Sequence, residues 1–247
     1  MKIIAKLNKI ALLAIIALAT FSCNNDDEPI VNPAPPAAKQ NIVQLAQATP
    51  DLSILVQALV KADLVTTLNG NGPFTVLAPT NAAFSAFLTA NNYANLDAVP
   101  VPALKKILLN HVVSGNIKAS GLPADGYFKT LATFGTSTDI FISTYVNKSN
   151  NAVTFNGGLL NSGAVVSPAG ADISASNGTI HIINGVINIP TIVNHAIANP
   201  ALDTLQAVVT STGGTFGDQS GVLAVLSGAT ATAPLTVFAP TNVMLNV

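Results

Sequence analysis

Residues 72–84 read GPFTVLAPTNAAF and combine a strand, its end and the start of a helix. The apolar run 74–78 predicts a buried β-strand, and Pro79 ends it because proline has no N–H to give to a sheet ladder. Thr80 or Asn81 has the side chain of a helix N-cap, since its oxygen can accept from a free N–H of the first turn. The predicted helix buries three side chains on one face: Phe84, Phe87 and Leu88.

Helices are also predicted on both sides of this stretch. Residues 42–48 form a short helix, and Thr49 is a good N-cap for the next one, with Pro50 at its first position and Asp51 in its first turn. Pro102 opens a further helix. Both helices carry an apolar stripe at helical spacing, the first with Leu52, Leu55, Val56 and Leu59, the second with Leu104, Ile107, Leu108 and His111.

From Tyr127 onward the pattern changes to short strands separated by turns rich in glycine, serine and asparagine. The strands are predicted at 140–146, 152–155, 164–166 and 179–187. A chain with helices first and strands later is expected to have an α+β fold.

The opening motif occurs a second time. Residues 234–242 read PLTVFAPTN, identical to residues 73–81 at seven of nine positions, and residues 192–202 likewise parallel residues 42–52. We therefore expect two homologous units, the second of them cut short, because only five residues follow Asn242. Residues 236–239 are predicted to be a core strand without its full set of partners, so the second unit is expected to be unstable in isolation.

The N-terminus has the pattern of an export signal. Three lysines, at positions 2, 6 and 9, precede the apolar run 10–19, which is too short to span a bilayer. Residues 1–22 are therefore predicted to be a signal peptide. The stretch 19–23, ATFSC, resembles a bacterial lipobox, which implies that Cys23 carries acyl chains and anchors the protein to a membrane.

Residues 23–40 are predicted to form a tether. Asp26, Asp27 and Glu28 follow the cysteine closely, and four prolines follow them. The acidic cluster resembles the surface-export signal of Bacteroidetes lipoproteins, but it also fits a simply solvated tether, and both interpretations stay open. A proline-rich segment favours an extended conformation that holds a domain away from the membrane.

Composition excludes several classes of function. The chain has no arginine, and removal of the first three lysines leaves seven against eleven acidic residues, so nucleic-acid binding is not expected. Cys23 is the only cysteine, which excludes an internal disulfide and a thiolate metal site.

The three histidines do not indicate catalysis or a metal site. His111 lies on an apolar helical stripe, and His181 alternates with isoleucines in a predicted strand, so both are interpreted as packed, hydrogen-bonded residues. No two histidines, His195 included, have the i, i+4 spacing of a helical metal site, and no G-x-S-x-G nucleophile elbow is present. We expect no enzymatic activity, no metal and no cofactor.

Three motifs together resemble the fasciclin domain: GPFTVLAPTNAAF at 72–84, LLNHVVSG at 108–115 and NGTIHIINGVINIP at 177–190. The resemblance implies a fasciclin-like α+β fold, a β-sandwich or wedge with several packed helices. It also implies adhesion or binding to other proteins and glycans. The chain departs from the family where Asn110 precedes His111 in place of tyrosine, and where Asn184 replaces aspartate. Asn110, His111, His181 and Asn184 are thus the candidate structural or partner-contact residues.

The expected organisation is a signal peptide (1–22), a tether (23–40), one fasciclin-like domain (41–190) and the N-terminal part of a second (191–247). The predicted function is a non-catalytic adhesion or binding module, lipid-anchored in the outer membrane and exposed at the cell surface. Its expected partners are surface glycans or extracellular proteins, with the membrane reached through the lipid anchor only. The alternative is a periplasm-facing structural lipoprotein that supports envelope assembly.

Overall fold

The strand predicted in the opening motif, β1 (Phe74–Pro79), lies inside a mixed sheet. In the computed structural model, which describes residues 39–135, 137, 139–149, 152–158, 163–210, 220–228 and 235–245, the strand order of this sheet is β2-β1-β8-β7. β1 runs parallel to β8, and the other two pairs are antiparallel. The three further strands are β2 (Val112–Ser114), β7 (Ile173–Ala175) and β8 (Gly178–Ile183).

A second, antiparallel sheet follows the chain order β3-β4-β5-β6. Its strands are β3 (Asp125–Thr133), β4 (Phe141–Ser149), β5 (Ala152–Phe155) and β6 (Ala164–Val165). An isolated bridge between Val166 and Ile183 joins the end of β6 to β8 of the first sheet. The fold is therefore α+β with two sheets, as predicted.

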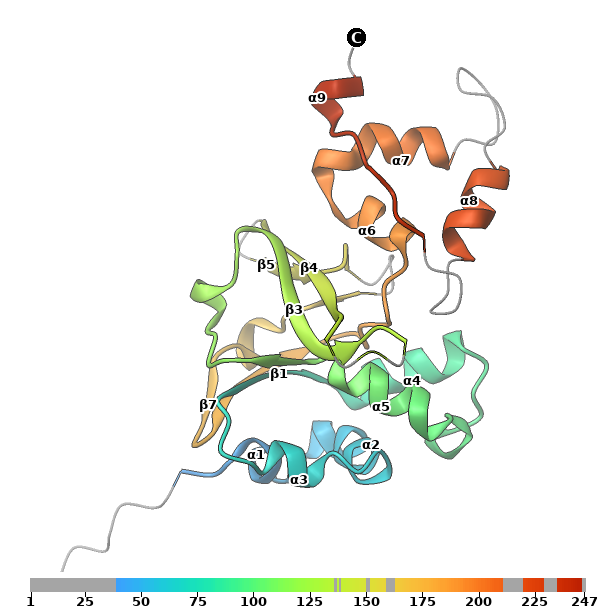
Figure 1. The fold of residues 1–247 in the computed structure, drawn as a ribbon. Coiled ribbons are helices and arrows are strands. Elements are labelled where there is room, and N and C mark those ends of the chain that lie inside the picture. Colours follow the sequence, from blue (N-terminus) through green and yellow to red (C-terminus); the bar gives the residue numbers. More distant parts are fainter. Residues whose placement is uncertain are drawn as a thin grey trace, which may run out of the picture. The chain divides into compact units, whose positions relative to one another are not determined.

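The helices of the domain are α1 (Ile42–Ala48), α2 (Ser53–Lys61), α3 (Val65–Leu68), α4 (Asn81–Ala90) and α5 (Val101–Leu109). Figure 1 shows α1, α2 and α3 on one side of β1 and the second sheet on the other. After the domain come α6 (Ile192–Ala198), α7 (Asp203–Val209), α8 (Ser220–Ser227) and α9 (Asn242–Leu245).

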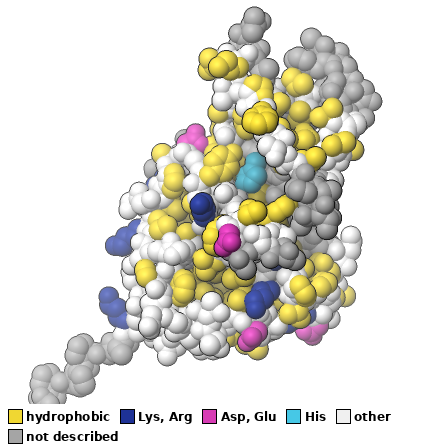
Figure 2. Space-filling model, in the orientation of Figure 1, with side chains coloured by type: hydrophobic (Ala, Val, Ile, Leu, Met, Phe, Trp, Pro, Cys, Tyr) yellow, Lys and Arg dark blue, Asp and Glu magenta, His cyan; other side chains and the backbone are white. Residues whose placement is uncertain are grey.

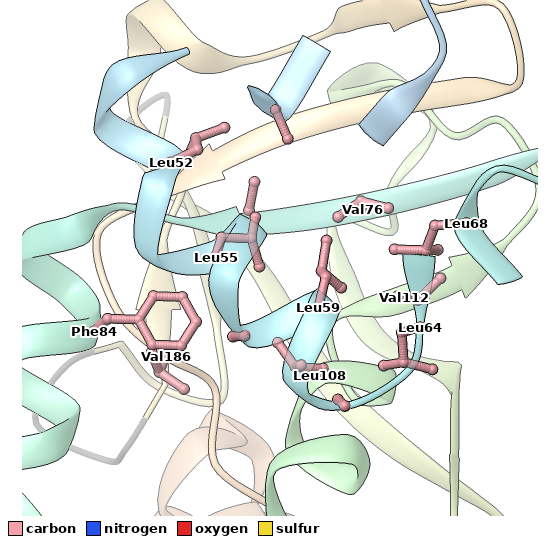
Figure 3. Close-up of a cluster of buried hydrophobic side chains, with 14 of the residues drawn as sticks. Leu52, Leu55, Leu59, Leu64, Leu68, Val76, Phe84, Leu108, Val112 and Val186 are labelled. Carbon is pink, nitrogen blue, oxygen red and sulfur yellow. The ribbon is translucent and has the colours of Figure 1, made fainter. Parts of the chain in front are cut away.

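Alternation along β1 divides the core into two clusters, because successive side chains of a strand point to opposite faces. Val76 and Ala78 join the larger cluster with the helices, and Figure 3 shows Leu55 and Leu59 of α2 beside Val76. Leu77 points the other way and packs with residues of the second sheet. β1 therefore contributes to both halves of the core.

Most predicted helix features are confirmed. α1 has the predicted bounds, Leu52, Leu55 and Leu59 are buried, and Thr80 is the N-cap of α4. Thr49 is the N-cap residue, with Pro50 and Asp51 in the first turn as predicted, but the turn that it starts is a 3-10 turn, Pro50–Leu52, before α2. The hydroxyl of Thr49 donates to the carbonyl of Leu45 and makes no capping hydrogen bond.

The predicted strand at 179–187 was too long. β8 ends at Ile183, and the next residue, Asn184, bonds to Val165 of β6. The backbone N–H of Asn184 donates to the carbonyl of Val165, and the side-chain oxygen of Asn184 accepts from the N–H of Val165. β5 has the predicted bounds, and β6 is one residue shorter than predicted. β4 begins one residue later and ends three residues later than predicted, and strands β2, β3 and β7 were missed. His111 does not belong to the stripe of α5, since that helix ends at Leu109.

Gly178 lets β8 approach β1, so its substitution gives a first prediction. A Cβ at Gly178 would overlap the carbonyl of Phe74, and neither strand can shift without disturbing both core clusters. Gly178→Ala is expected to lower the free energy of unfolding by about 3 kcal/mol or more, measured by urea denaturation. Gly221→Ala in α8 is the control, because an added Cβ there meets nothing within 4 Å. Equal stability of the two variants would contradict the packing described.

Candidate functional site

His111 holds the end of the domain to helix α5. The backbone N–H of Ile187 donates to Nε2 of His111 (2.9 Å), so Nδ1 carries the proton and donates to the carbonyl of Ile107 (2.8 Å). Both ring nitrogens are thereby used, and the side chain is buried. A ring with no free nitrogen in a closed site is neither a general base nor a metal ligand.

The burial of His111 also changes its titration. Desolvation by burial lowers its pKa from 6.5 to about 4, and the hydrogen bond to Ile107 offsets only part of this effect. The ring is therefore neutral at physiological pH, in agreement with the acceptor role of Nε2.

Asn110, like His111, joins the end of α5 to the segment at residues 187–188. Its side-chain N–H group donates to the carbonyls of Ile187 (3.3 Å) and Asn188 (3.2 Å), and its oxygen accepts from the hydroxyl of Thr130 in β3 (3.1 Å). The residue is fully buried. Asn110 and His111 thus join three segments that are distant in sequence, and neither is available to a partner at the surface.

His181 has a similar structural role in β8. It is fully buried, its Nε2 donates to the carbonyl of Ile117 (2.9 Å), and its Nδ1 accepts from the N–H of Asp172 (3.2 Å). The Asp172 carboxylate lies 3.7 Å from the same Nδ1. His181 therefore fastens β8 to the loops before β3 and β7.

The remaining candidate residues do not join these histidines in one site. Asn184 is exposed, but its side-chain oxygen is engaged by the N–H of Val165 (2.8 Å). Cys23, the predicted lipidation site, lies outside the described residues. His195 in α6 is half-buried, burial lowers its pKa, and its Nδ1 has no hydrogen-bond partner.

Asn177 is the important residue that sequence reasoning missed. Its side-chain oxygen accepts from the N–H of Ile42 (3.0 Å), and its amide donates to the carbonyls of Leu68 (2.8 Å) and Gly70 (2.9 Å). Its own carbonyl accepts from the N–H of Phe74 at the start of β1. The only signal in the sequence was its place immediately before Gly178, which is also typical of an ordinary turn.

The described residues contain no group of three histidine, cysteine, aspartate or glutamate side chains that could hold a metal ion. In the same part of the chain, no helix is long and apolar enough to cross a membrane.

A groove on the surface of the domain lies between two edge strands, β2 and β3. β2 and β3 are each the first strand of their sheet, and a groove of about 470 Å³ opens between them. Its lining is mainly apolar and includes Ile117 and Phe128, with Phe141 and Lys129 at exposed positions. An edge strand offers free backbone groups beside such side chains, which suits contact with a partner.

This two-sheet α+β domain has buried, hydrogen-bonded polar residues and an open apolar groove. The fasciclin domain model matches residues 50–190, and the chain belongs to that family. Fasciclin domains are generally associated with adhesion and are typically not enzymes.

Similar proteins include two from Synechocystis sp.: Protein sll1483, 36% identical over 70% of this chain and 86% of its own length, and Uncharacterized protein sll1735, 35% identical over 60% and 96%. Pig transforming growth factor-beta-induced protein ig-h3 is 34% identical over 56% of this chain, which spans 18% of that protein. A FAS1 domain pair from the insect cell adhesion molecule Fasciclin I aligns with a TM-score of 0.46 and 17% identity over 64% of this chain and 53% of the pair.

The lowered pKa of His111 predicts acid destabilisation. Between pH 6.5 and about 4 the unfolded chain binds a proton on this ring that the folded chain does not, so the free energy of unfolding falls as the pH falls. The stabilisation is complete above pH 6.5, and about 3 kcal/mol of it is expected to be lost by pH 4. Urea denaturation across this range measures it.

The variant His111→Ala is expected to lose about 2–4 kcal/mol at pH 7, since the N–H of Ile187 is left buried without a partner, and to show a flatter pH profile. Val60→Ala, at an exposed position of α2, is the control and keeps the wild-type profile. An unchanged slope in His111→Ala would exclude the histidine as its source.

Proposed function

We propose that this protein is a lipid-anchored, non-catalytic binding module that mediates adhesion at the outer face of the cell envelope. The observation that carries the proposal is the fasciclin domain over residues 50–190, a domain generally associated with adhesion. The proposed partners are surface glycans or extracellular proteins.

The N-terminal sequence supports the anchoring. A lysine-containing start, a short apolar run and the single cysteine at position 23 form the pattern of a lipoprotein signal. Several acyl chains on Cys23 would give stable attachment, at about 0.8 kcal/mol for each buried CH₂. The proline-rich residues up to position 40 would then separate the domain from the membrane.

The absence of catalysis is supported by how the polar groups of the domain are used. Asn110, His111 and His181 all bond to the backbone inside the fold, and no ring nitrogen of the two buried histidines is left to act on a substrate. General acid–base chemistry needs such a group within reach of a bound molecule.

The surface supports contact by uncharged groups. In the view of Figure 2, lysine and acidic side chains stand singly or in small groups among uncharged ones. The groove between β2 and β3 offers apolar side chains beside an edge strand, and Phe141 at its rim is 42% exposed. We take this groove as the adhesive surface.

Protease treatment of intact cells tests the location. The native protein is expected to be degraded, Cys23→Ala to leave the cells in soluble form, and the chain with Asp26, Asp27 and Glu28 neutralised to be protected. Protection of the neutralised variant is expected because, in this proposal, the acidic cluster is the signal for export of the lipoprotein to the cell surface.

Protection of the native protein would contradict surface display and favour the periplasm-facing structural role. Degradation of the neutralised variant would leave the anchor in place but make the acidic cluster a simple tether. A cytoplasmic marker protein that stays intact is the control for cell lysis.

A substitution in the groove tests the adhesive surface. Phe141→Asp is expected to reduce attachment of the protein to immobilised matrix or glycan panels about tenfold or more, because a carboxylate replaces an apolar contact at the groove. Val60→Asp is the matched control, since Val60 is 63% exposed on α2, outside the groove. Equal attachment of the two variants would exclude the groove.

A further inference from the structure

The chain contains five Asn-Gly pairs, and the structure gives them different environments. The asparagines are at positions 69, 71, 156, 177 and 184. In such a pair the backbone nitrogen of the glycine can attack the side-chain amide of the asparagine, because glycine has no side chain to hinder the approach. The attack is intramolecular, so it requires only that the side chain can turn towards this nitrogen and that the nitrogen is not already hydrogen-bonded.

Three of the five asparagine side chains are held by hydrogen bonds. Asn177 is buried and uses its side-chain oxygen and its amide in three bonds. Asn156 is also buried, and its side-chain oxygen accepts from the N–H of Tyr145 (2.9 Å). The side-chain oxygen of Asn184 accepts from the N–H of Val165 (2.8 Å). A side chain fixed in this way turns towards the next nitrogen only when the fold opens locally.

Asn69 and Asn71 are both exposed, but they differ in the nitrogen that follows them. The N–H of Gly70 donates to the carbonyl of Thr67 (3.2 Å), in the turn just after α3. The N–H of Gly72 and the side chain of Asn71 have no hydrogen-bond partner among the described residues, and Gly72 belongs to neither a helix nor a strand. In the pair at Asn71, therefore, neither reacting group is held.

The fold itself requires the glycine that makes Asn71 reactive. Gly72 has a φ of +59°, in the left-handed region that favours glycine. A Cβ at this position would lie 2.3 Å from the carbonyl oxygen of Asn177, which accepts from the N–H of Phe74 at the start of β1. A side chain at position 72 that hindered the attack would therefore also disturb this end of β1.

We propose that Asn71 is a site of spontaneous deamidation in the folded protein and reacts before the other four pairs. The nitrogen of Gly72 loses its proton and forms a bond to Cγ of Asn71, and the side-chain nitrogen leaves as ammonia. Water then opens the cyclic imide. Cleavage of the bond to Cγ gives aspartate, and cleavage of the bond to the main-chain carbonyl carbon gives isoaspartate. The net reaction consumes water and releases ammonia, with no oxidation or reduction.

The product lies in a short loop that Asn177 holds at both ends. The amide of Asn177 donates to the carbonyl of Gly70 (2.9 Å), and its backbone carbonyl accepts from the N–H of Phe74 (3.0 Å). Isoaspartate at position 71 adds a methylene to the main chain between these two contacts, so both cannot keep their geometry. Deamidation is therefore expected to loosen the start of β1. This inference goes beyond the proposed function and does not depend on it.

Site-resolved mass spectrometry of the aged protein tests the proposal. The full chain is incubated for weeks at neutral pH in water labelled with heavy oxygen and then cleaved after lysine, which leaves Asn69 and Asn71 in one peptide, residues 62–105. Tandem spectra locate the label. Asn71 is expected to react about fivefold to tenfold faster than Asn69, because the hydrogen bond of Gly70 must break first. An unmodified Asn71, or equal rates at the two sites, would overturn the proposal.

The same incubation in urea is the reference for the effect of local sequence. In the unfolded chain the five rates are expected to lie within about threefold of one another, since the fold then holds none of the side chains. Folding is expected to leave the rate at Asn71 nearly unchanged and to lower the rates at Asn156, Asn177 and Asn184 at least about tenfold. A rate at Asn71 that falls on folding as much as the rate at Asn177 would overturn the proposal.

Two matched variants test the effect on β1. Asn71→Gln keeps an exposed amide but would have to close a larger ring, so it is expected to stay unmodified, whereas Asn69→Gln is expected to leave the reaction at Asn71 unchanged. After the same ageing, the wild-type and Asn69→Gln proteins are expected to unfold at a lower urea concentration than before, and Asn71→Gln to keep its midpoint. Equal loss in all three proteins, or loss in none, would overturn the loosening of β1 by this modification.

Discussion

The parallel pairing of β1 with β8 is the constraint on which the rest of the domain depends. The two strands lie about a hundred residues apart in sequence, and they pair along their full length from Phe74 opposite Gly178 to Pro79 opposite Ile183. Their close approach requires that position 178 carry no side chain. Asn177 fixes the same end, because its four hydrogen bonds hold the start of α1, the end of α3 and the start of β1. Both core clusters form around this pair.

Three of the candidate site residues form hydrogen bonds that join segments inside the fold. Asn110, His111 and His181 each bond to carbonyl or N–H groups of segments distant in sequence, and all three are buried. Such a network is stabilising only when every member has a partner, and burial within it lowers the pKa of His111 and keeps the ring neutral. The adhesion proposed for this protein would then use the outer surface, where the edges of β2 and β3 and the groove between them are available.

The two copies of the repeated motif share their helix-start hydrogen bonds but differ in how far their side chains are buried. The corresponding helices α1 and α6 both begin with a capping box, although the capping residues differ. The asparagine at the end of each motif makes the same contact to the helix region before it. The capping boxes need only residues three apart in sequence. The asparagine contact spans 27 residues in the first copy and 38 in the second, so it depends on the packing of the motif against the preceding helix region. Burial depends on strands that are distant in sequence: Leu77 of β1, between β2 and β8, is 1% exposed, whereas Phe238, in a segment with which no described strand pairs, is 92% exposed.

The sequence by itself determined the α+β class, the helix α1, the strand β1 and the apolar faces that form the core, because each depends on periodicity and on breakers such as Pro79. The family followed from the resemblance of three motifs to the fasciclin domain. It also indicated correctly that His111 and His181 are packed and hydrogen-bonded. It did not determine the parallel partner of β1, the short strands β2 and β7, the end of β8 at Asn184 or the role of Asn177. Those features depend on hydrogen bonds between residues far apart in the chain, and their partners are chosen only when the two sheets and the helices close on one core.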